Sequence, residues 1–394
     1  MKTLYNLLLR TTISLLLTFV MLEAGLAWLC YSGRLKIAKP SYCLSNIGSR
    51  FWADSNPFFG VWHDPHSSFK HVSPDYNLTY HANAQGMRDK ERDQKSHGKK
   101  RVVILGDSFI EGWGVPSEDR LSDRLERMTG LEHLNFGTSG SFGPTQYLML
   151  YTHLAKSFEH DALIIAILPD NDFLDDDYEY GRIMHGDRVR PFFTGTKPNY
   201  ELLITKPQVP SPSSKLLEQA LLNLTYTGNL IKHFKSLSRH HQATIPANYA
   251  GYFDFTPAQW DRMEKVLQEF RLAAPSLPIL VLTIPCDTDI QRTEKIGEAP
   301  LPLKMRTLCK TLEMQYLDLM PAIRATPEGW QACYLKTDRH WNARGNEVAA
   351  EEISKQWSVS SGNNQTAAEW AVLSAGVFAY CKLLTAYCSL LTAH

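Results

Sequence analysis

Two polar segments, far apart in the chain, hold residue types that could together perform nucleophilic chemistry. The apolar run 102–105 ends in a Gly-Asp-Ser turn that delivers Ser108, and a later loop places Asp338 two residues before His340. A serine hydroxyl attacks an acyl carbon with the help of a base of near-neutral pKa, and a histidine base needs a partner that fixes its tautomer. Ser108, His340 and Asp338 are therefore candidates for nucleophile, base and orienting carboxylate. Each segment alone is also consistent with an ordinary polar turn.

The elements that would position these residues are short apolar runs rich in β-branched side chains, which are typical of buried strands in a parallel sheet. The expected strands are 102–105, 131–136, 161–168, 278–285 and 314–319. Strands joined through helical crossovers form an α/β fold, here a three-layer α/β/α sandwich with a five-stranded, mainly parallel sheet. Ligands bind beyond the carboxyl ends of such strands, which is where Ser108 would lie.

Helix signals occupy the connections between the expected strands. Ser117 is expected to cap a helix that stops at Gly130, and Pro144 opens another that runs to residue 158. A third helix starts at 256–257, and a fourth covers 347–357. These helices supply the outer layers of the expected sandwich.

The first two polar blocks resemble those of the SGNH (GDSL-like) hydrolase superfamily, and the resemblance spans about residues 101–357. The sequence Gly-Asp-Ser-Phe at 106–109 is similar to the block that bears the catalytic serine of the family. The sequence Asn-Phe-Gly-Thr-Ser-Gly at 135–140 is similar to the second block, whose glycine amide lines the oxyanion hole. Gly140 is the better match to that glycine, and Gly137 is the fallback.

The other two blocks of the family are matched with departures. Asn171 is similar to the asparagine of the third block, whose side chain is a further oxyanion donor, although Pro169 replaces the usual glycine. The family usually spaces its last block as Asp-x-x-His, whereas the residue three before His340 is Thr337. The form Asp338-x-His-Trp is instead similar to a membrane-associated or periplasmic branch that includes alginate acetylation proteins.

The resemblance implies a mechanism without metal or organic cofactor. His340 would deprotonate Ser108, and the oxyanion would be held by the Ser108 amide, the Gly140 amide and the Asn171 side chain. The main hypothesis is a serine esterase that removes O-acyl groups, in particular acetyl groups, from a cell-envelope or extracellular glycan. The alternatives are an O-acetyltransferase acting on a polysaccharide, a lipase or phospholipid esterase, and a noncatalytic glycan-binding protein.

The N-terminus predicts a membrane anchor. Residues 11–31 are mostly apolar and long enough to cross a hydrocarbon layer of about 30 Å as a helix, with Glu23 as the one acidic interruption. A cleaved signal peptide is the competing interpretation, because 25–27 loosely resembles a cleavage site. The length of the apolar run favours the anchor, and the family resemblance implies a periplasmic or other extracytoplasmic catalytic domain.

Composition shifts suggest the remaining boundaries. The expected parts are an anchor at 1–33, a loop-rich lead-in arm at 34–95, a hydrolase-like domain at 96–360 with an insertion at 174–255, and an apolar tail at 361–394. Within the insertion, residues 215–237 are expected to form a helix that packs over the edge or crevice of the sheet. A basic and apolar membrane-surface helix is the alternative there. In the tail, 370–391 could be a second crossing or an interfacial segment.

Charge and metal ligands give mostly negative expectations. The 41 basic and 41 acidic residues cancel, so the overall charge does not favour nucleic-acid binding. His63, His66 and His71 are expected to be surface residues rather than metal ligands. The acidic run 170–179 is expected to be a solvated loop rather than a calcium site. The seven cysteines are odd in number, and Cys309 with Cys333 is the expected disulfide if one forms.

Overall fold

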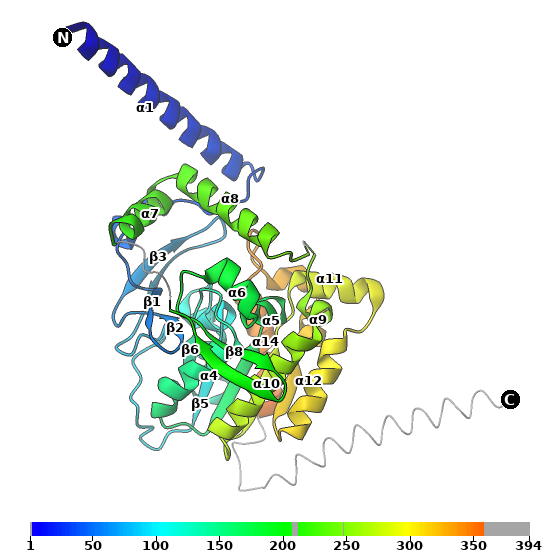
Figure 1. The fold of residues 1–394 in the computed structure, drawn as a ribbon. Coiled ribbons are helices and arrows are strands. Elements are labelled where there is room, and N and C mark those ends of the chain that lie inside the picture. Colours follow the sequence, from blue (N-terminus) through cyan, green and yellow to red (C-terminus); the bar gives the residue numbers. More distant parts are fainter. Residues whose placement is uncertain (1, 207–211, 247, 358–394) are drawn as a thin grey trace, which may run out of the picture. The chain divides into compact units, whose positions relative to one another are not determined.

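A computed structural model describes residues 2–206, 212–246 and 248–357 of the chain (Figure 1). Its centre is a parallel sheet of five strands, β5 (Arg101–Gly106), β6 (Glu132–Gly137), β7 (Ala162–Ile167), β10 (Ile279–Thr283) and β11 (Gln315–Asp318). The strand order is β11-β10-β7-β5-β6, and all neighbours pair in parallel. The expected strands and fold class are therefore confirmed. The chain leaves β5 toward β6 on one side and returns to β7 on the other, so the sheet has its switch point beside β5.

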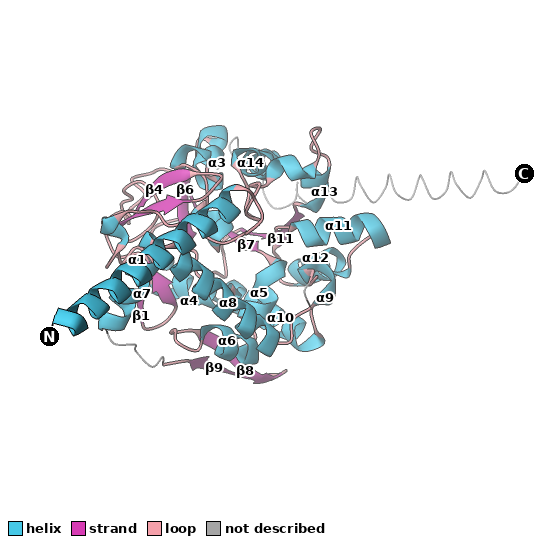
Figure 2. Cartoon of the chain, turned by 90° about the horizontal axis from the view of Figure 1, so that it is seen from above, coloured by secondary structure: helices cyan, strands magenta, loops and turns pink. Residues whose placement is uncertain are grey.

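The strands are buried because helices cover both faces of the sheet. Figure 2 shows α3 (Leu121–Thr129) and α14 (Ala343–Trp357) on one face, and α4 (Pro144–His153) and α10 (Pro257–Ala273) on the other. Every residue of β5 and β7 is buried. Runs of buried apolar residues are what a parallel sheet covered on both faces requires. The remaining helices after β10 and β11 are α11 (Asp287–Ile296), α12 (Pro300–Thr311) and α13 (Met320–Arg324).

Some expected helix limits were wrong. Ser117 makes no capping bond and instead begins a 3-10 turn, Ser117–Asp119, that precedes α3. The helix opened by Pro144 ends at His153 and is followed by a second 3-10 turn, Ala155–Ser157. Thr256 caps α10 as its side chain accepts a hydrogen bond from the Gln259 amide, which confirms that helix start.

The lead-in arm consists of two antiparallel hairpins. One pairs β1 (Ala53–Asn56) with β2 (Gly60–Trp62), and the other pairs β3 (Ser68–Val72) with β4 (Asn77–His81). The fully buried Phe51 and Tyr80 form a small apolar cluster of their own. The arm that was expected to be loop-rich thus contains two hairpins and an apolar cluster of its own.

The insertion begins with α6 (Tyr178–His185) and the antiparallel pair β8 (Pro191–Thr196) and β9 (Asn199–Ile204). It continues with α7 (Pro212–Leu224), α8 (Tyr226–Gln242) and the short α9 (Gly251–Asp254).

The single helix expected at 215–237 was wrong, because the chain breaks at Thr225, whose hydroxyl caps α8. A Cβ atom on Gly228 would lie 2.6 Å from the Leu221 carbonyl oxygen, so glycine is required for α7 and α8 to approach this closely.

The N-terminal helix α1 (Lys2–Tyr31) is long and apolar enough to cross a membrane, a test that a signal sequence also passes. The tail at 361–394, with the possible second crossing at 370–391, lies outside the described residues. Cys309 and Cys333 are free and buried, so the expected disulfide was wrong. The Cys333 sulfur instead contacts the Thr326 hydroxyl at 3.3 Å.

Candidate active site

Ser108 lies at the carboxyl end of β5, as expected, on the first residue of the short helix α2 (Ser108–Glu111). Asp107 caps this helix, because its carboxylate accepts a hydrogen bond from the Phe109 amide at 3.0 Å. A Cβ atom on Gly106 would lie 2.3 Å from Ile110. The glycine and the cap together let the strand turn directly into the helix and present the serine.

The structure brings Ser108, His340 and Asp338 into one chain of hydrogen bonds. The Ser108 hydroxyl lies 2.7 Å from His340 Nε2, and His340 Nδ1 contacts the Asp338 carboxylate. The second Asp338 oxygen accepts a hydrogen bond from the Trp113 indole at 2.9 Å. A histidine held in this way can take a proton from the serine while the carboxylate fixes its tautomer.

The Asp338 carboxyl group is held in its charged form. Partial burial by itself would raise its pKa, but the hydrogen bonds from His340 and Trp113 outweigh this effect and lower the pKa to about 2. Asp338 is therefore ionised throughout the neutral range. It can stabilise the imidazolium that forms when His340 accepts a proton.

Two aromatic rings limit the orientations that His340 can adopt. Trp113 stacks on its imidazole with ring centroids 5.2 Å apart, and Phe109 lies at 5.0 Å. The sequence did not single out Trp113, although its indole is also the second hydrogen-bond partner of Asp338. The histidine is thus positioned by ring packing as well as by its carboxylate.

The loop that carries His340 is tied to three other parts of the molecule. The amide and hydroxyl of Thr337 donate hydrogen bonds of 2.8 and 2.7 Å to Asp75, in the turn between β3 and β4. Arg339 forms ion pairs with Asp170 at 3.1 Å and with Asp287 at 2.6 Å. These ties are long-range, and sequence reasoning missed all four charged residues as positioning groups.

Backbone hydrogen bonds distinguish the two glycines that were expected as oxyanion donors. Neither Ser108 nor Gly140 uses its backbone amide in a hydrogen bond within the described residues. The Gly140 carbonyl accepts a hydrogen bond from Arg188 at 2.6 Å, and its φ of 111° disfavours any residue with a side chain. The Gly137 amide is already bonded to Asn135 Oδ1 at 2.9 Å.

Asn171 follows β7 in the first turn of α5 (Pro169–Asp175), a helix where the sequence suggested a loop. Proline at the first helical position explains why Pro169 fits where the family has glycine. The Asn171 Nδ2 atom lies 3.5 Å from an Asp107 oxygen, and its Oδ1 atom is buried without a hydrogen-bond partner among the described residues. Burial raises the pKa of Asp107 to about 6.

Glu111 connects α2, which begins at Ser108, with the lead-in arm and the segment 135–140. Its buried carboxylate accepts hydrogen bonds from the Trp52 indole at 3.0 Å and from the Ser139 amide at 2.7 Å, and it contacts His63 Nε2 at 3.2 Å. Burial opposes ionisation, but the contacts with His63 outweigh it and the pKa of Glu111 is lowered. The segment that leads to Gly140 is therefore held by a charge next to Ser108.

The expectation of surface histidines holds for His66 alone. His63 is fully buried, because its Nδ1 atom lies 2.7 Å from the Gly86 carbonyl and its Nε2 atom contacts Glu111. His71 is half-buried beside Trp113, and burial lowers its pKa to about 4. The partners of His63 and the Trp113 ring beside His71 come from distant segments, whereas the hydrogen-bond partner of His71 is the nearby Tyr76 hydroxyl at 3.1 Å.

The acidic run at 170–179 is also not a solvated loop. Asp172 is buried and accepts hydrogen bonds from the Tyr147 hydroxyl at 2.9 Å and the Leu168 amide at 2.8 Å. Asp176 is buried against Thr145. The carboxylates therefore cap and connect elements behind the site.

One group of possible metal ligands lies nearby. Asp170, Cys286 and Asp289 place ligand atoms within 4.8 Å of one another. Arg339 already provides a positive charge to Asp170, and burial raises the pKa of the Cys286 thiol, which disfavours the thiolate that a metal would need. These three residues therefore fit an ion pair with Arg339 better than they fit a metal ion.

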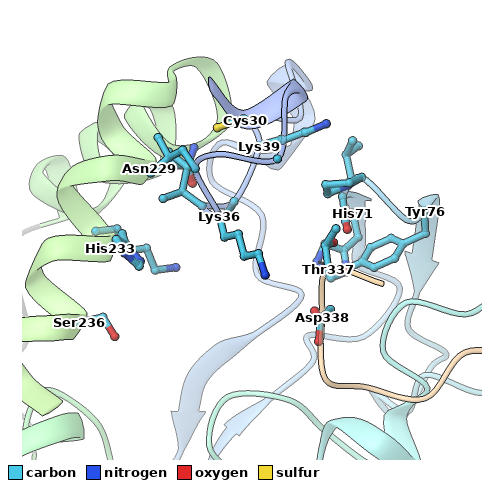
Figure 3. A pocket seen from close by; sticks show the side chains of 18 of the residues that line it. Cys30, Lys36, Lys39, His71, Tyr76, Asn229, His233, Ser236, Thr337 and Asp338 are labelled. Atoms are coloured by element: carbon cyan, nitrogen blue, oxygen red, sulfur yellow. Dashed lines mark hydrogen bonds between the residues drawn. The ribbon is translucent and has the colours of Figure 1, made fainter. Parts of the chain in front are cut away.

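A pocket of about 420 Å³ borders the site on the Asp338 side. Figure 3 shows Lys36 pointing into it between α8, which contributes His233 and Ser236, and the loop of Thr337 and Asp338. The pocket also borders Trp113 and the segment that follows α1. It is a space in which a bound molecule could lie beside the Asp338–His340 pair.

The comparisons with known proteins agree with this picture. Residues 302–378 match a family model described as the SGNH hydrolase-like domain of acetyltransferase AlgX, of which 358–378 lie outside the described residues. The matched segment contains both Asp338 and His340. No curated protein sequence matches the chain.

Solved structures similar to this chain include a member of the lipolytic protein G-D-S-L family from Veillonella parvula DSM 2008, with 10% identity, coverage of 65% of this chain and 97% of that chain, and a TM-score of 0.35. Another is the lipase/acylhydrolase from Enterococcus faecalis, with 11% identity, coverage of 68% and 100%, and a TM-score of 0.34. A third is a carbohydrate esterase family 2 enzyme plus carbohydrate binding domain from Corynascus thermopiles (Myceliophthora fergusii), with 13% identity, coverage of 66% and 65%, and a TM-score of 0.34. The strand order and the family match show an SGNH hydrolase-like fold, and residues 302–378 are similar to the SGNH hydrolase-like domain of acetyltransferase AlgX.

Proposed function

We propose that this chain is a serine-dependent O-acetyltransferase that acts on a polysaccharide of the cell envelope. The observation that carries the proposal is the match of residues 302–378 to an acetyltransferase domain. The matched segment contains Asp338 and His340, which are hydrogen-bonded to each other and, through His340, to Ser108. The sequence alone ranked ester hydrolysis first. The family match reverses that order, because it names acetyl transfer.

In the first half-reaction, His340 accepts the proton of the Ser108 hydroxyl as the serine oxygen bonds to the acyl carbon of the donor. The amides of Ser108 and Gly140 and the side chain of Asn171 stabilise the oxyanion, each contributing about 3–4 kcal/mol to lowering the barrier. The bond from the acyl carbon to the leaving oxygen then breaks, and His340 returns the proton to that oxygen. An acetyl-serine remains.

In the second half-reaction, His340 removes the proton of a sugar hydroxyl, and the sugar oxygen attacks the acetyl carbon. The bond to Ser108 breaks, and the serine oxygen regains a proton from His340. Water in place of the sugar would give hydrolysis, so the two activities differ only in what occupies the acceptor position. An acceptor held close and oriented competes with water through its high effective concentration.

Partitioning tests this proposal. The purified full chain would be given an activated acetyl ester with and without oligosaccharide acceptors, while free acetate and acetylated sugar are both quantified. Acetylated sugar should dominate at modest acceptor concentration, and Ser108→Ala should remove both products. Acetate release that is indifferent to every acceptor would instead establish ester hydrolysis, the second candidate.

The remaining alternatives make different predictions in the same assay. A lipid-directed esterase would prefer phospholipids over short acetyl esters. A noncatalytic glycan-binding protein would produce neither acetate nor acetylated sugar. The intact Ser108–His340–Asp338 chain supports an enzyme, and the α1 helix supports an extracytoplasmic domain held at the membrane.

A further inference from the structure

The helices α7 and α8 expose large apolar side chains that nothing in the described chain covers. Leu217 on α7 is 62% exposed and Phe234 on α8 is 60% exposed. The other exposed apolar residues of the two helices are Leu216, Leu221, Leu224, Ile231 and Leu237. A soluble surface seldom gathers so many, and such a gathering marks an interaction site.

The charges on the same two helices are mostly positive. Lys215 lies on α7, and Lys232, Lys235 and Arg239 lie on α8, whereas Glu218 is the one acidic residue of either helix. Helices with exposed leucine and phenylalanine among basic residues are typical of elements that lie in the membrane interface. The composition therefore favours an anionic lipid surface over an acidic or neutral protein partner.

The position of α8 relative to α1 is fixed by Glu23. Its carboxylate accepts hydrogen bonds from the amides of Tyr226 at 2.7 Å and Thr227 at 2.8 Å, in the first turn of α8. Leu26 and Cys30 pack against Tyr226 just beyond it. The acidic residue that interrupts the apolar run is thus used as a helix cap at the junction with α8.

The length of α1 places this junction at a membrane boundary. The contact between Glu23 and α8 moves the crossing from the expected 11–31 to 3–22, a stretch that includes Arg10. Residues 3–22 are all exposed and mostly apolar, and about 20 residues at about 1.5 Å each span about 30 Å, the thickness of a hydrocarbon layer. Glu23 then falls at the edge of that layer. The first turn of α8 is bonded to Glu23. The exposed face of α7 and α8 therefore starts at the same depth in the membrane.

We propose that α7 and α8 lie on the bilayer surface beside the point where α1 leaves it, with their apolar side chains at the boundary of headgroups and acyl chains. Lys215 and Lys235 then lie near anionic headgroups, whereas Lys232 lines the pocket and Arg239 donates a hydrogen bond to the Met184 carbonyl. Figure 1 shows the two helices next to the end of α1, and the pocket of Figure 3 lies between α8 and the Asp338 loop. This contact orients the pocket, with Lys36 in it, toward the headgroup layer. It holds whether the enzyme transfers or hydrolyses acetyl groups.

Depth-dependent quenching in nanodiscs tests the contact with the full chain. The starting protein would carry no cysteine at positions 43, 381 and 388, so that none of these thiols takes up the label. One environment-sensitive label would then be attached through Leu217→Cys or Phe234→Cys. The matched control is Leu303→Cys on α12, a leucine that is equally exposed at 68%. Since all three side chains are exposed, the substitutions should leave folding intact.

The nanodiscs would contain phosphatidylcholine and phosphatidylglycerol, with and without acyl-chain bromine. Bromine should quench the labels at positions 217 and 234 at least about threefold more than the label at 303, because quenching requires immersion at the acyl boundary. Equal quenching at all three positions would overturn the proposal. Unlabelled Leu217→Cys or Phe234→Cys chains that form disulfides between chains in the nanodisc on mild oxidation would overturn it too, because they would assign this face to a second copy.

Discussion

The parallel sheet and the lead-in arm both contact the candidate site, but they supply different kinds of groups. The sheet supplies the groups that could react, because Ser108 follows β5 and Asn171 follows β7. The arm supplies groups that hold them, as Asp75 binds Thr337 and His63 binds Glu111. Reacting groups thus depend on where strands end, and their alignment depends on packing between distant segments. Substitutions in the two regions should separate loss of chemistry from loss of alignment.

The sharpest test on the sheet side is Ser108→Ala. Activity should fall by about 10⁶-fold, because a nucleophile acts as a unit with its base. The melting temperature should stay unchanged, since the capping bond from Phe109 to Asp107 does not involve the serine side chain. Turnover of an activated acetyl ester and a thermal melt measure the two effects. Turnover retained on any substrate of the wild type would end the nucleophile assignment.

Asp338→Asn should lower kcat/KM by about 10⁴-fold, because the amide would favour the wrong tautomer of His340. The pKa of Asp338 is lowered to about 2, so its negative charge stabilises the fold at neutral pH. This stabilisation is lost only as the pH falls toward about 2. The wild-type rate profile should therefore show no limb from Asp338 above about pH 4. A near-wild-type rate for the variant would mean that another carboxylate orients the histidine.

Glu111→Gln should lower both the stability and the rate, because Glu111 lies where the arm meets the sheet. The buried carboxylate accepts hydrogen bonds from Trp52 and Ser139, and a neutral amide would place donors against donors at a cost of about 3–5 kcal/mol in the free energy of unfolding. The rate should fall about tenfold as the segment before Gly140 loosens. Urea unfolding and kcat measure both. The exposed Glu118→Gln is the control, and equal behaviour of the two variants would contradict a positioning role.

The sheet was predictable because its determinants are local. Runs such as 102–105 and 161–168 are apolar, short and β-branched, so their burial and their strand ends follow from the sequence. The blocks at 106–109 and 135–140 could be recognised for the same reason. The predicted Ser108 follows β5, and Asp338 and His340 lie in the loop that precedes α14. The sequence blocks around them could therefore be recognised although they are far apart in the chain.

The arm and the acidic run were not predictable because their determinants are distant. His63 looks like a surface histidine until Glu111 and the Gly86 carbonyl bind both ring nitrogens. Asp172 looks solvated until Tyr147 reaches it. A polar residue becomes buried when its partners are supplied by other segments, and no local periodicity records that pairing.

Asp75→Ala removes the tie from the arm to the loop that carries His340 and should have a smaller effect. Two hydrogen bonds to Thr337 are lost at an exposed position, so kcat should fall about 3- to 10-fold with little change in KM. Asp64→Ala is the matched control, because Asp64 lies in the same arm and pairs with Arg50 instead. A split between kcat and KM identifies misalignment of His340. Equal rates for the two variants would show that the arm does not position the loop.

The smallest expected effect concerns stability rather than rate, and it tests the buried charge beneath the nucleophile. Burial raises the pKa of Asp107 to about 6, so the folded state binds a proton more readily than the unfolded chain does. Stability contributed by this group is therefore lower above that pH and increases as the pH falls from about 6 toward about 4.

Asp107→Asn removes this penalty while it keeps an oxygen acceptor for the Phe109 amide. The variant should be more stable than the wild type by about 1–3 kcal/mol near pH 7.5, and the difference should shrink toward zero near pH 4. Urea unfolding at the two pH values measures the change. A variant that is less stable than the wild type at neutral pH would mean that the Asp107 charge contributes more to holding Asn171 than its burial costs.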